Sequence, residues 1–239
     1  MSPFEFLWRL LPNLLFGFPA QRPGGLALSV FIAALAIGAG FGLALIVGAG
    51  RLSRWWIARQ LAAIYVEVFR GLPLLLLLLL IHQVIGGKRF GLDFSPLTSA
   101  LITLALYTSA YQAEIVRTGL AAVPQEVIDS ARLMGAGRWQ VFFFVRLRYA
   151  LRVMLPAFTG QAISLFKDSS VVVVLGVGEL TTVARSALGS DVRNAAYWVP
   201  VYMCVGLLYA GVALAISRLA ARWERQARVA DRLKNLANL

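Results

Sequence analysis

Charged residues are scarce in this chain of 239 residues, making up only 14%, whereas soluble domains have about a quarter. Hydrophobic residues make up 59%, and the mean hydropathy is +0.75. A soluble fold with so few charges could not cover its surface, and the composition also excludes a disordered chain and a disulfide-rich secreted module. The lipid bilayer is therefore the expected solvent.

Histidine and cysteine are nearly absent, with one residue of each, His82 and Cys204. The counts exclude an intramolecular disulfide and argue against cysteine-based or His-pair metal sites and a His-based catalytic triad. An intramembrane enzyme is disfavoured for the same reason. The chain also lacks the Gly-x-x-x-x-Gly-Lys-Ser/Thr phosphate loop, so we expect it to hold no cofactor and not to hydrolyse ATP itself.

Acidic residues are few as well, with 11 Asp and Glu against 23 Lys and Arg, for a net charge of +12. Such an excess could indicate nucleic-acid binding, but the sequence has no basic stripe with interleaved aromatic residues. Basic ends that hold an apolar body in an anionic membrane explain the charge better. We expect the lipid bilayer, and no nucleic acid, as a partner.

Five segments are long and apolar enough for membrane-spanning helices, which need about 20 such residues. They are residues 23–50, 61–85, 94–118, 153–177 and 194–217. Pro73 and Pro156 should kink or start helices. Ala34, Gly38 and Gly42 repeat at helical spacing and would let another helix approach, although general glycine content explains them equally well. The sequence predicts an all-α, polytopic bundle of five transmembrane helices.

Basic residues are divided unequally between alternate connections. One side has Arg51, Arg54, Arg59, Arg132, Arg138, Arg146, Arg148, Arg152, Arg218, Arg222, Arg225, Arg228, Arg232 and Lys234; the other has only Arg9, Arg22, Lys88, Arg89, Arg185 and Arg193. Because Lys and Arg concentrate in cytoplasmic loops, we predict a multi-pass protein of the cytoplasmic (inner) membrane with its N-terminus outside and its C-terminus inside. Three regions follow: an external segment at 1–23, a transmembrane domain at 24–221 with a cytoplasmic loop at 119–156, and a basic cytoplasmic tail at 222–239.

Two pairs of opposite charge lie within or at the ends of the predicted spans. Glu67 and Arg70 are three residues apart, as are Glu114 and Arg117, so each pair shares one face of its helix. Isolated charges are costly in a bilayer, and their default interpretation is functional. Structural ion pairing explains both pairs too, and we favour it for Glu114–Arg117.

Lys167 and Asp168 lie near the middle of the fourth predicted span. Neighbouring residues point about 100° apart on a helix, so each needs a partner from another helix or from water. We therefore predict a polar cavity where a polar solute could pass; Glu67, Arg70, Lys167, Asp168 and Ser169 are its candidate lining, or a structural polar set. The alternative is a stand-alone secondary transporter with a Lys167–Asp168 proton or ion relay. That class predicts inverted repeats, which the sequence lacks.

The loop at 119–156 carries the signature of a short helix. Pro124 suits the first helical position, Glu126 and Asp129 suit the positive helix end, and Gly135-Ala136-Gly137 should end the helix. One face is small enough to lie in another protein's groove. It is formed by Ile128, Ala131, Arg132 and Gly135. A helix lying on lipid headgroups, anchored by Arg138, Trp139 and Arg146, is the alternative.

The same loop resembles the EAA loop of permease subunits in binding-protein-dependent ABC importers. The family pattern is Glu-Ala-Ala, three residues, Gly, nine residues, Ile, one residue and Leu-Pro. Asp129-Ser130-Ala131 stand at Glu-Ala-Ala and Gly135 at the glycine; Val145 and Leu147 stand at the Ile and Leu, while Arg148 replaces the proline.

Further segments resemble the branch of this family that serves polar amino acids of the histidine, glutamate, glutamine, arginine and opine type. They are Tyr65–Leu75, Ala110–Arg117, Lys167–Ser170 and Gly176–Leu180. The resemblance implies a type I importer permease of MetI-like architecture, with its coupling helix at Asp129–Gly135. It also implies a cytoplasmic ATPase dimer that holds ATP and Mg, a second permease subunit (identical or paralogous) and an external substrate-binding protein.

Overall fold

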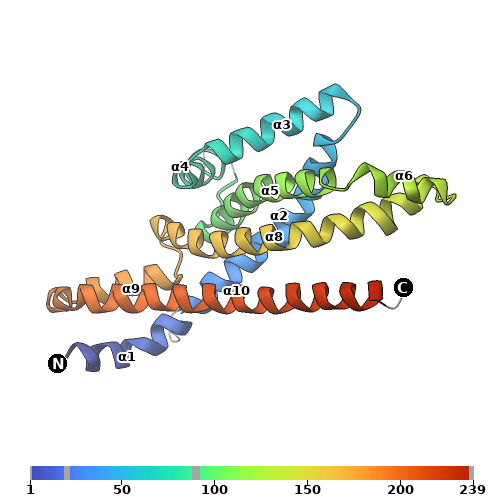
Figure 1. Cartoon of the computed structure of the whole chain (residues 1–239). Coiled ribbons are helices and arrows are strands. Elements are labelled where there is room, and N and C mark those ends of the chain that lie inside the picture. Colours follow the sequence, from blue (N-terminus) through green and yellow to red (C-terminus); the bar gives the residue numbers. More distant parts are fainter. Residues whose placement is uncertain (1, 19–21, 88–91, 237–239) are drawn as a thin grey trace.

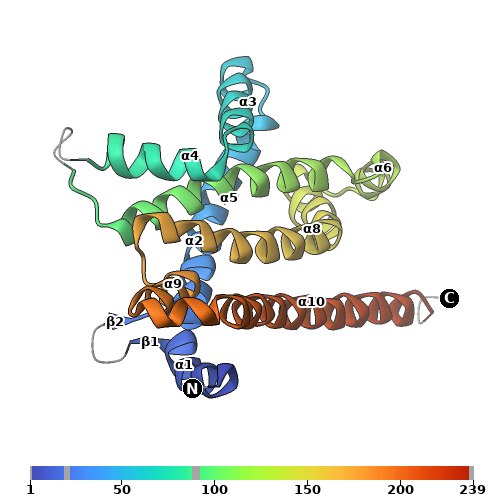
Figure 2. The same ribbon diagram turned by 90° about the vertical axis from the view of Figure 1, so that its left-hand side faces the viewer.

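The computed structural model describes residues 2–18, 22–87 and 92–236, and nearly all of its elements are helices. Figures 1 and 2 show α1, α9 and α10 on one side, α5 and α8 in the middle and α3 and α4 on the other, with α2 crossing all three layers. The main helices are α1 (Pro3–Phe16), α2 (Gly25–Arg51), α3 (Trp56–Gly71), α4 (Leu74–Leu79), α5 (Pro96–Ala121), α6 (Gln125–Leu133), α7 (Arg138–Gln140), α8 (Leu147–Asp168), α9 (Leu180–Gly189) and α10 (Trp198–Leu236).

Shorter elements join these helices. Strands β1 (Gly17–Phe18) and β2 (Arg22–Pro23) pair antiparallel between α1 and α2. π-Helical turns extend α4 and link α7 to α8, and 3₁₀ helices follow α8 and precede α10. Their bounds are Leu80–Ile85, Val141–Arg146, Ser169–Leu175 and Val192–Tyr197.

Helices occupy all five predicted spans, but they differ in how long and how apolar they are. In the described part of the chain, α2 and the stretch Val192–Trp223 are long and apolar enough to cross a membrane, and α3 with the helix after it qualifies only as a bent pair. Helix α5 is long but more polar because it lies inside the bundle, where Ser99, Thr103 and Gln112 are buried. Helix α8 carries charged residues near both ends.

The second predicted span is broken at Pro73. Helix α3 ends at Gly71, Leu72 is extended, and the helix that begins at Leu74 turns away by 105°. Proline disfavours a helical conformation at the residue before it, so the predicted break is confirmed. Pro156 does not start a helix, because helical structure continues from Arg138 through Pro156 to Asp168. The alternative, that Pro156 kinks this helix, stays a prediction.

Helices α2 and α5 pack almost backbone to backbone. A Cβ atom at Gly40 would lie 2.6 Å from Thr108 Cγ2 and 2.9 Å from the Ala105 carbonyl oxygen. A Cβ atom at Gly48 would lie 3.1 Å from Val116 Cγ1. Close approach through small residues is how helices associate where water supplies no hydrophobic driving force.

The row of small residues that makes this contact differs from the predicted one. Ala36 and Ala44 are buried on the same side as Gly40, whereas no atom lies within 4 Å of a Cβ placed at Gly38 or Gly42. Of the two interpretations of the row with Ala34, close approach of another helix is therefore not seen at Gly38 or Gly42 within the described part of the chain. Two residues correspond to about 200° on a helix, so the two rows point in nearly opposite directions.

Helix α1 lies in the segment that the sequence analysis described only as external. Ser2 caps it, with its Oγ accepting a hydrogen bond of 3.2 Å from the Glu5 N–H, and Pro3 is the first helical residue. Leu10 and Leu14 pack into a hydrophobic cluster with residues of α9 and α10. The Ser-x-x-Glu spacing at residues 2–5 is a helix-start signature that could have predicted this helix.

We predict that Gly40→Leu destabilises the bundle by about 1–3 kcal/mol, because the new side chain meets a backbone carbonyl that cannot turn aside. Gly42→Leu is the matched control on the open face of α2, with an expected change within about 0.5 kcal/mol. Thermal denaturation of the detergent-solubilised protein, followed by size-exclusion chromatography, measures both. Equal denaturation temperatures for the two variants would contradict the α2–α5 contact.

Candidate functional site

Helix α6 ends in the backbone geometry that the sequence predicts. Gly135 has a φ of +84°, in the left-handed region that glycine adopts without a Cβ penalty. The Ala136 N–H donates to the Ala131 carbonyl at 3.1 Å, and the Gly135 N–H donates to the Arg132 carbonyl at 2.9 Å. These two bonds form a Schellman motif, which satisfies the last carbonyl groups of the helix.

One face of α6 is turned toward its own chain. Ile128 and Ala131 are only 4% and 7% exposed, and they pack with Val123, Val141 and Met154. The prediction that Ile128 and Ala131 present a docking surface is therefore wrong. Burying this apolar face holds α6 against the start of the long helix that ends with α8.

The opposite face and the tip of α6 are exposed. Leu133 and Met134 are 89% and 82% exposed, directly before Gly135. Asp129, Ser130 and Arg132 are exposed beside them, as is Gly135; Asp129 forms an ion pair of 3.4 Å with Arg132 and accepts a hydrogen bond from Gln125. Sequence reasoning missed the two large apolar residues at the tip, although their place before the terminating glycine was a usable signal.

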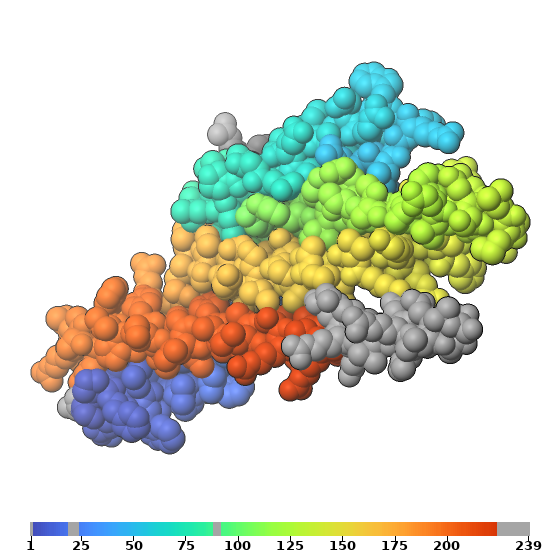
Figure 3. Space-filling model, in the orientation of Figure 1, coloured from blue at the N-terminus to red at the C-terminus, as the bar shows by residue number. Residues whose placement is uncertain are grey.

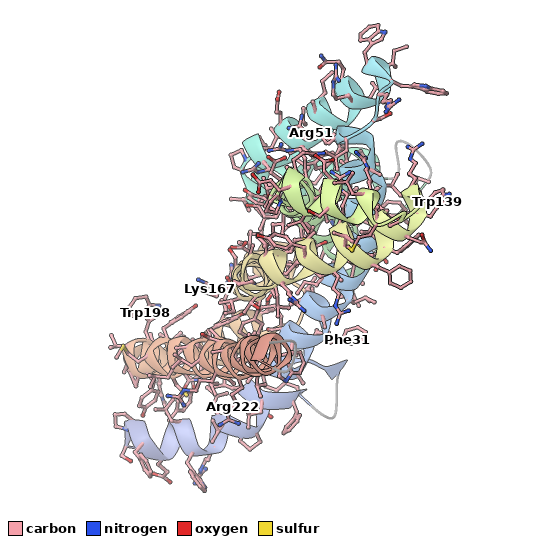
Figure 4. All side chains as sticks on the ribbon, turned by 45° about the vertical axis from the view of Figure 1, so that its right-hand side comes forward. Phe31, Arg51, Trp139, Lys167, Trp198 and Arg222 are labelled. Carbon is pink, nitrogen blue, oxygen red and sulfur yellow. The ribbon has the colours of Figure 1, made fainter. Side chains whose placement is uncertain are left out.

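The chain returns from α6 as one continuous helix. α7, the π-helical turn Val141–Arg146 and α8 follow one another without a break. Arg148 stands where the family pattern has proline, so nothing interrupts the helix at that point. Trp139 is 73% exposed and projects from the same end of the molecule as α6 (Figure 4), in agreement with either predicted role of this loop.

Glu114 lies in a three-residue ion cluster. Arg117 donates to both of its carboxylate oxygens, and Arg51 at the end of α2 lies 3.6 Å away. The predicted structural pair Glu114–Arg117 is confirmed, and Arg51 joins it through folding. The cluster neutralises charge where α2 meets α5, which makes a structural role the better interpretation.

Glu67 and Arg70 do not pair with each other. In the described part of the chain the ion pairs involve other residues, and both side chains are exposed. The Arg70 guanidinium instead lies over the ring of Tyr111, 5.1 Å from its centroid. The prediction of a neutralising Glu67–Arg70 pair is wrong because α3 places Arg70 against α5, where the aromatic face attracts the cation.

Lys167 and Asp168 stand at the end of α8 rather than within a continuous α-helical span. Lys167 is exposed and projects from the bundle (Figure 4), while Asp168 is half-buried and accepts a hydrogen bond of 3.5 Å from Ser164. Ser169 is fully buried, and its hydroxyl donates to the Phe166 carbonyl at 2.7 Å. Ser169 therefore does not line a surface with its neighbours.

Two tyrosines connect the positions of Arg70 and Asp168. The Tyr107 and Tyr111 hydroxyl groups are 3.2 Å apart on successive turns of α5. The Arg70 guanidinium lies over the ring of Tyr111, and Asp168 is within electrostatic range of Tyr107 without a direct bond to it. We call Arg70, Tyr107, Tyr111 and Asp168 the polar strip. Of the predicted pathway residues, the structure brings Arg70 and Asp168 to this strip and leaves Glu67 and Ser169 outside it.

We predict that Gly135→Val loosens the end of α6, because a β-branched residue is strained at a positive φ by about 1–2 kcal/mol. Gly135→Asn should be tolerated better, since asparagine visits the left-handed region more readily. Limited trypsin digestion at Arg132 and Arg138 tests this, with cleavage about 5-fold faster in the valine variant and little changed in the asparagine variant. Equal cleavage in all three proteins would argue against the strained turn.

Comparisons with known proteins agree on one kind of relative. Residues 36–229 match the family described as "Binding-protein-dependent transport system inner membrane component". The octopine transport system permease protein OccM of Rhizobium radiobacter is 33% identical over 226 residues, covering 91% of this chain and 87% of the relative. The glutamine transport system permease protein GlnP of Escherichia coli K12 is 28% identical over 223 residues, covering 93% and 96%.

Solved structures show the same fold. The crystal structure of an amino acid ABC transporter with histidines superposes with a TM-score of 0.81 at 27% identity, covering 95% of this chain and 99% of that one. An inward-facing MetNI methionine ABC transporter superposes with a TM-score of 0.68 at 21% identity, again covering 95% and 99%.

Proposed function

Because this chain belongs to the family of binding-protein-dependent inner-membrane transport components, as the permease component of an amino-acid ABC importer, we propose that it moves a polar amino acid into the cytoplasm and is driven through α6 by separate ATPase subunits. The single observation that carries this proposal is α6 itself. It is a short helix anchored on its inner face, with a bare apolar tip. The names of two relatives give glutamine and octopine as the compounds that they transport, and both are polar amino acids of this kind.

The proposed docking surface consists of Leu133 and Met134, the exposed polar residues Asp129, Ser130 and Arg132, and the exposed Gly135. Large apolar side chains at 89% and 82% exposure fit a groove on a partner. Ile128 and Ala131 pack α6 against the helix that ends in α8. A movement of the α6 tip would therefore be transmitted to the membrane part of the chain. The ATPase dimer binds ATP and Mg, and this chain binds neither.

The proposed membrane arrangement has five spans, with the N-terminus outside and the C-terminus inside. Figures 1 and 3 support it, because the end of α2 and α6 lie at one end of the molecule and α1 lies at the other; Figure 1 also shows the end of α10 on the side of α6. The helix ends that border the predicted cytoplasmic connections thus lie at one end. Lys88 and Arg89, predicted to be external, lie outside the described residues. A second permease subunit and an external substrate-binding protein complete the importer.

The proposed pathway follows the polar strip. A free amino acid carries a carboxylate and an ammonium group, and the strip offers a guanidinium at Arg70 and a carboxylate at Asp168. The hydroxyl groups of Tyr107 and Tyr111, 3.2 Å apart, add further hydrogen-bonding groups to the strip. Lys167 is exposed next to Asp168, which keeps the end of α8 close to neutral.

We predict that the double substitution Leu133→Ser and Met134→Ser weakens ATPase binding at least 10-fold, since two exposed apolar side chains lose their burial in the partner. Membrane insertion should be unchanged because neither side chain packs inside the chain. Pull-down of the ATPase from solubilised membranes measures binding, and uptake of labelled amino acids measures transport.

The matched control for the coupling experiment is Phe4→Ser with Trp8→Ser, which removes two exposed apolar residues of α1 at the opposite end. This control should bind the ATPase as the unaltered protein does. Full ATPase binding by the α6 variant would show that the tip is not the docking surface. The alternative helix lying on headgroups would then explain the loop better.

We also predict that Arg70→Gln and Asp168→Asn each raise the KM for uptake about 10-fold, because each removes one charge that complements the substrate. Arg185→Gln, on the exposed surface of α9, is the control and should leave the KM unchanged. Uptake is measured at constant amounts of assembled complex. A KM that stays the same in both strip variants would remove the polar strip from the pathway.

A further inference from the structure

A buried carboxylate caps α9 outside the sites described above. Glu179 is fully buried at the N-cap of this helix. Its Oε1 accepts hydrogen bonds from the Thr182 N–H at 2.8 Å and the Thr182 hydroxyl at 3.1 Å, and its Oε2 accepts from the Thr181 N–H at 2.9 Å. A side-chain acceptor at this position satisfies N–H groups that have no partner within the helix.

The same carboxylate also reaches two other helices. Its Oε2 accepts from the Tyr209 hydroxyl of α10 at 2.8 Å and from the Ser29 hydroxyl of α2 at 3.3 Å. Five groups therefore donate to Glu179. Glutamine has the same shape, but its NH₂ group would face donors on one side. A carboxylate at this depth is tolerated only because protein groups surround it.

Backbone contacts lock the start of α2 to the residues before Glu179. The Gly25 N–H donates to the Gly178 carbonyl at 2.9 Å. A Cβ atom at Gly24 would clash with the Gly178 carbonyl oxygen, and one at Gly25 would clash with the Leu14 carbonyl oxygen. We call this contact, formed by Gly24, Gly25, Ser29, Gly178, Glu179 and Tyr209, the Glu179 joint.

The chain that enters the joint comes from the polar strip. After Asp168 it forms the 3₁₀ helix Ser169–Leu175 and then Gly176, which has a φ of +70° and no atom within 4 Å of its Cβ position. A left-handed glycine with open space at its Cβ position thus connects the 3₁₀ helix to the joint, which is tightly packed at Gly24 and Gly25. Figure 2 shows α9 between α8 on one side and α1 and α10 on the other.

We propose that Glu179 is a positioning residue for transport, which fixes the point from which the segment Asp168–Leu175 is held against α2 and α5 while the permease alternates access. The proposal rests on the proposed function. Its basis is that one carboxylate bonds to α2, α9 and α10 together. Few contacts hold this part of the chain, because only 11% of the apolar window in Val192–Trp223 is buried, and the Tyr209–Glu179 hydrogen bond is one of them.

The test is the amount of amino acid transported per ATP hydrolysed by the complete complex in vesicles, with its ATPase and binding protein. Glu179→Gln should lower this ratio about 10-fold, and Tyr209→Phe, which removes only the tie to α10, about 3-fold. A merely structural role would lower the amount of assembled complex and leave the ratio unchanged. Glu5→Gln, on the exposed face of α1, is the control and should keep the ratio.

Unchanged ratios in Tyr209→Phe and in whatever Glu179→Gln complex assembles would overturn the proposal. If Glu179→Gln fails to assemble, Tyr209→Phe alone decides, since it leaves the α9 cap in place. If the unaltered complex hydrolyses ATP without transporting any of the polar amino acids offered, the proposed function fails, and this result differs from a failure of the joint.

Discussion

The contact of α2 with α5 at Gly40 and Gly48 places the other helices of the membrane domain. With no side chain between the two backbones, α5 becomes the inner helix. Helix α3 packs on the same pair through Val66, which joins a cluster with Ala44 and Ala113. Lipid tails are as apolar as leucine, so the helices gain little by merely leaving the lipid, and shape complementarity must hold them together.

Charged groups fall into two kinds once the helices are placed. Arg51 and Arg117 both face Glu114, and this cluster stabilises the junction of two helices. Arg70 has no carboxylate partner in the described ion pairs and lies at the surface of the bundle. Charges that already have partners stabilise the fold, whereas Arg70 keeps its guanidinium available, as the proposed pathway requires.

Local sequence rules predicted the features that depend on neighbouring residues. The break at Pro73 and the end of α6 at Gly135 follow from backbone sterics, which a few residues determine. The helical nature of all five apolar segments follows from composition. The Ser2–Glu5 signature shows that even α1 was within reach of such rules.

Features that depend on distant residues could not be predicted in the same way. Whether Ile128 faces inward depends on Val141 and Met154, and the partner of Arg70 depends on where α5 brings Tyr111. Two rows of small residues in α2 were equally regular, and only the position of Thr108 selects the one with Gly40. A single sequence contains no direct information on these pairings.

The sparse burial of α10 has a consequence for how this protein tolerates change. Only 11% of the apolar window in Val192–Trp223 is buried within the described part of the chain, and wherever lipid covers the remainder it does not distinguish leucine from valine or phenylalanine. Most positions there can exchange one apolar residue for another at little cost. Tyr209, Val201 and Val205 are the exceptions because protein atoms surround them. Substitutions of one apolar residue for another should therefore accumulate rapidly along this helix, while changes to polar residues stay rare and a few positions stay fixed.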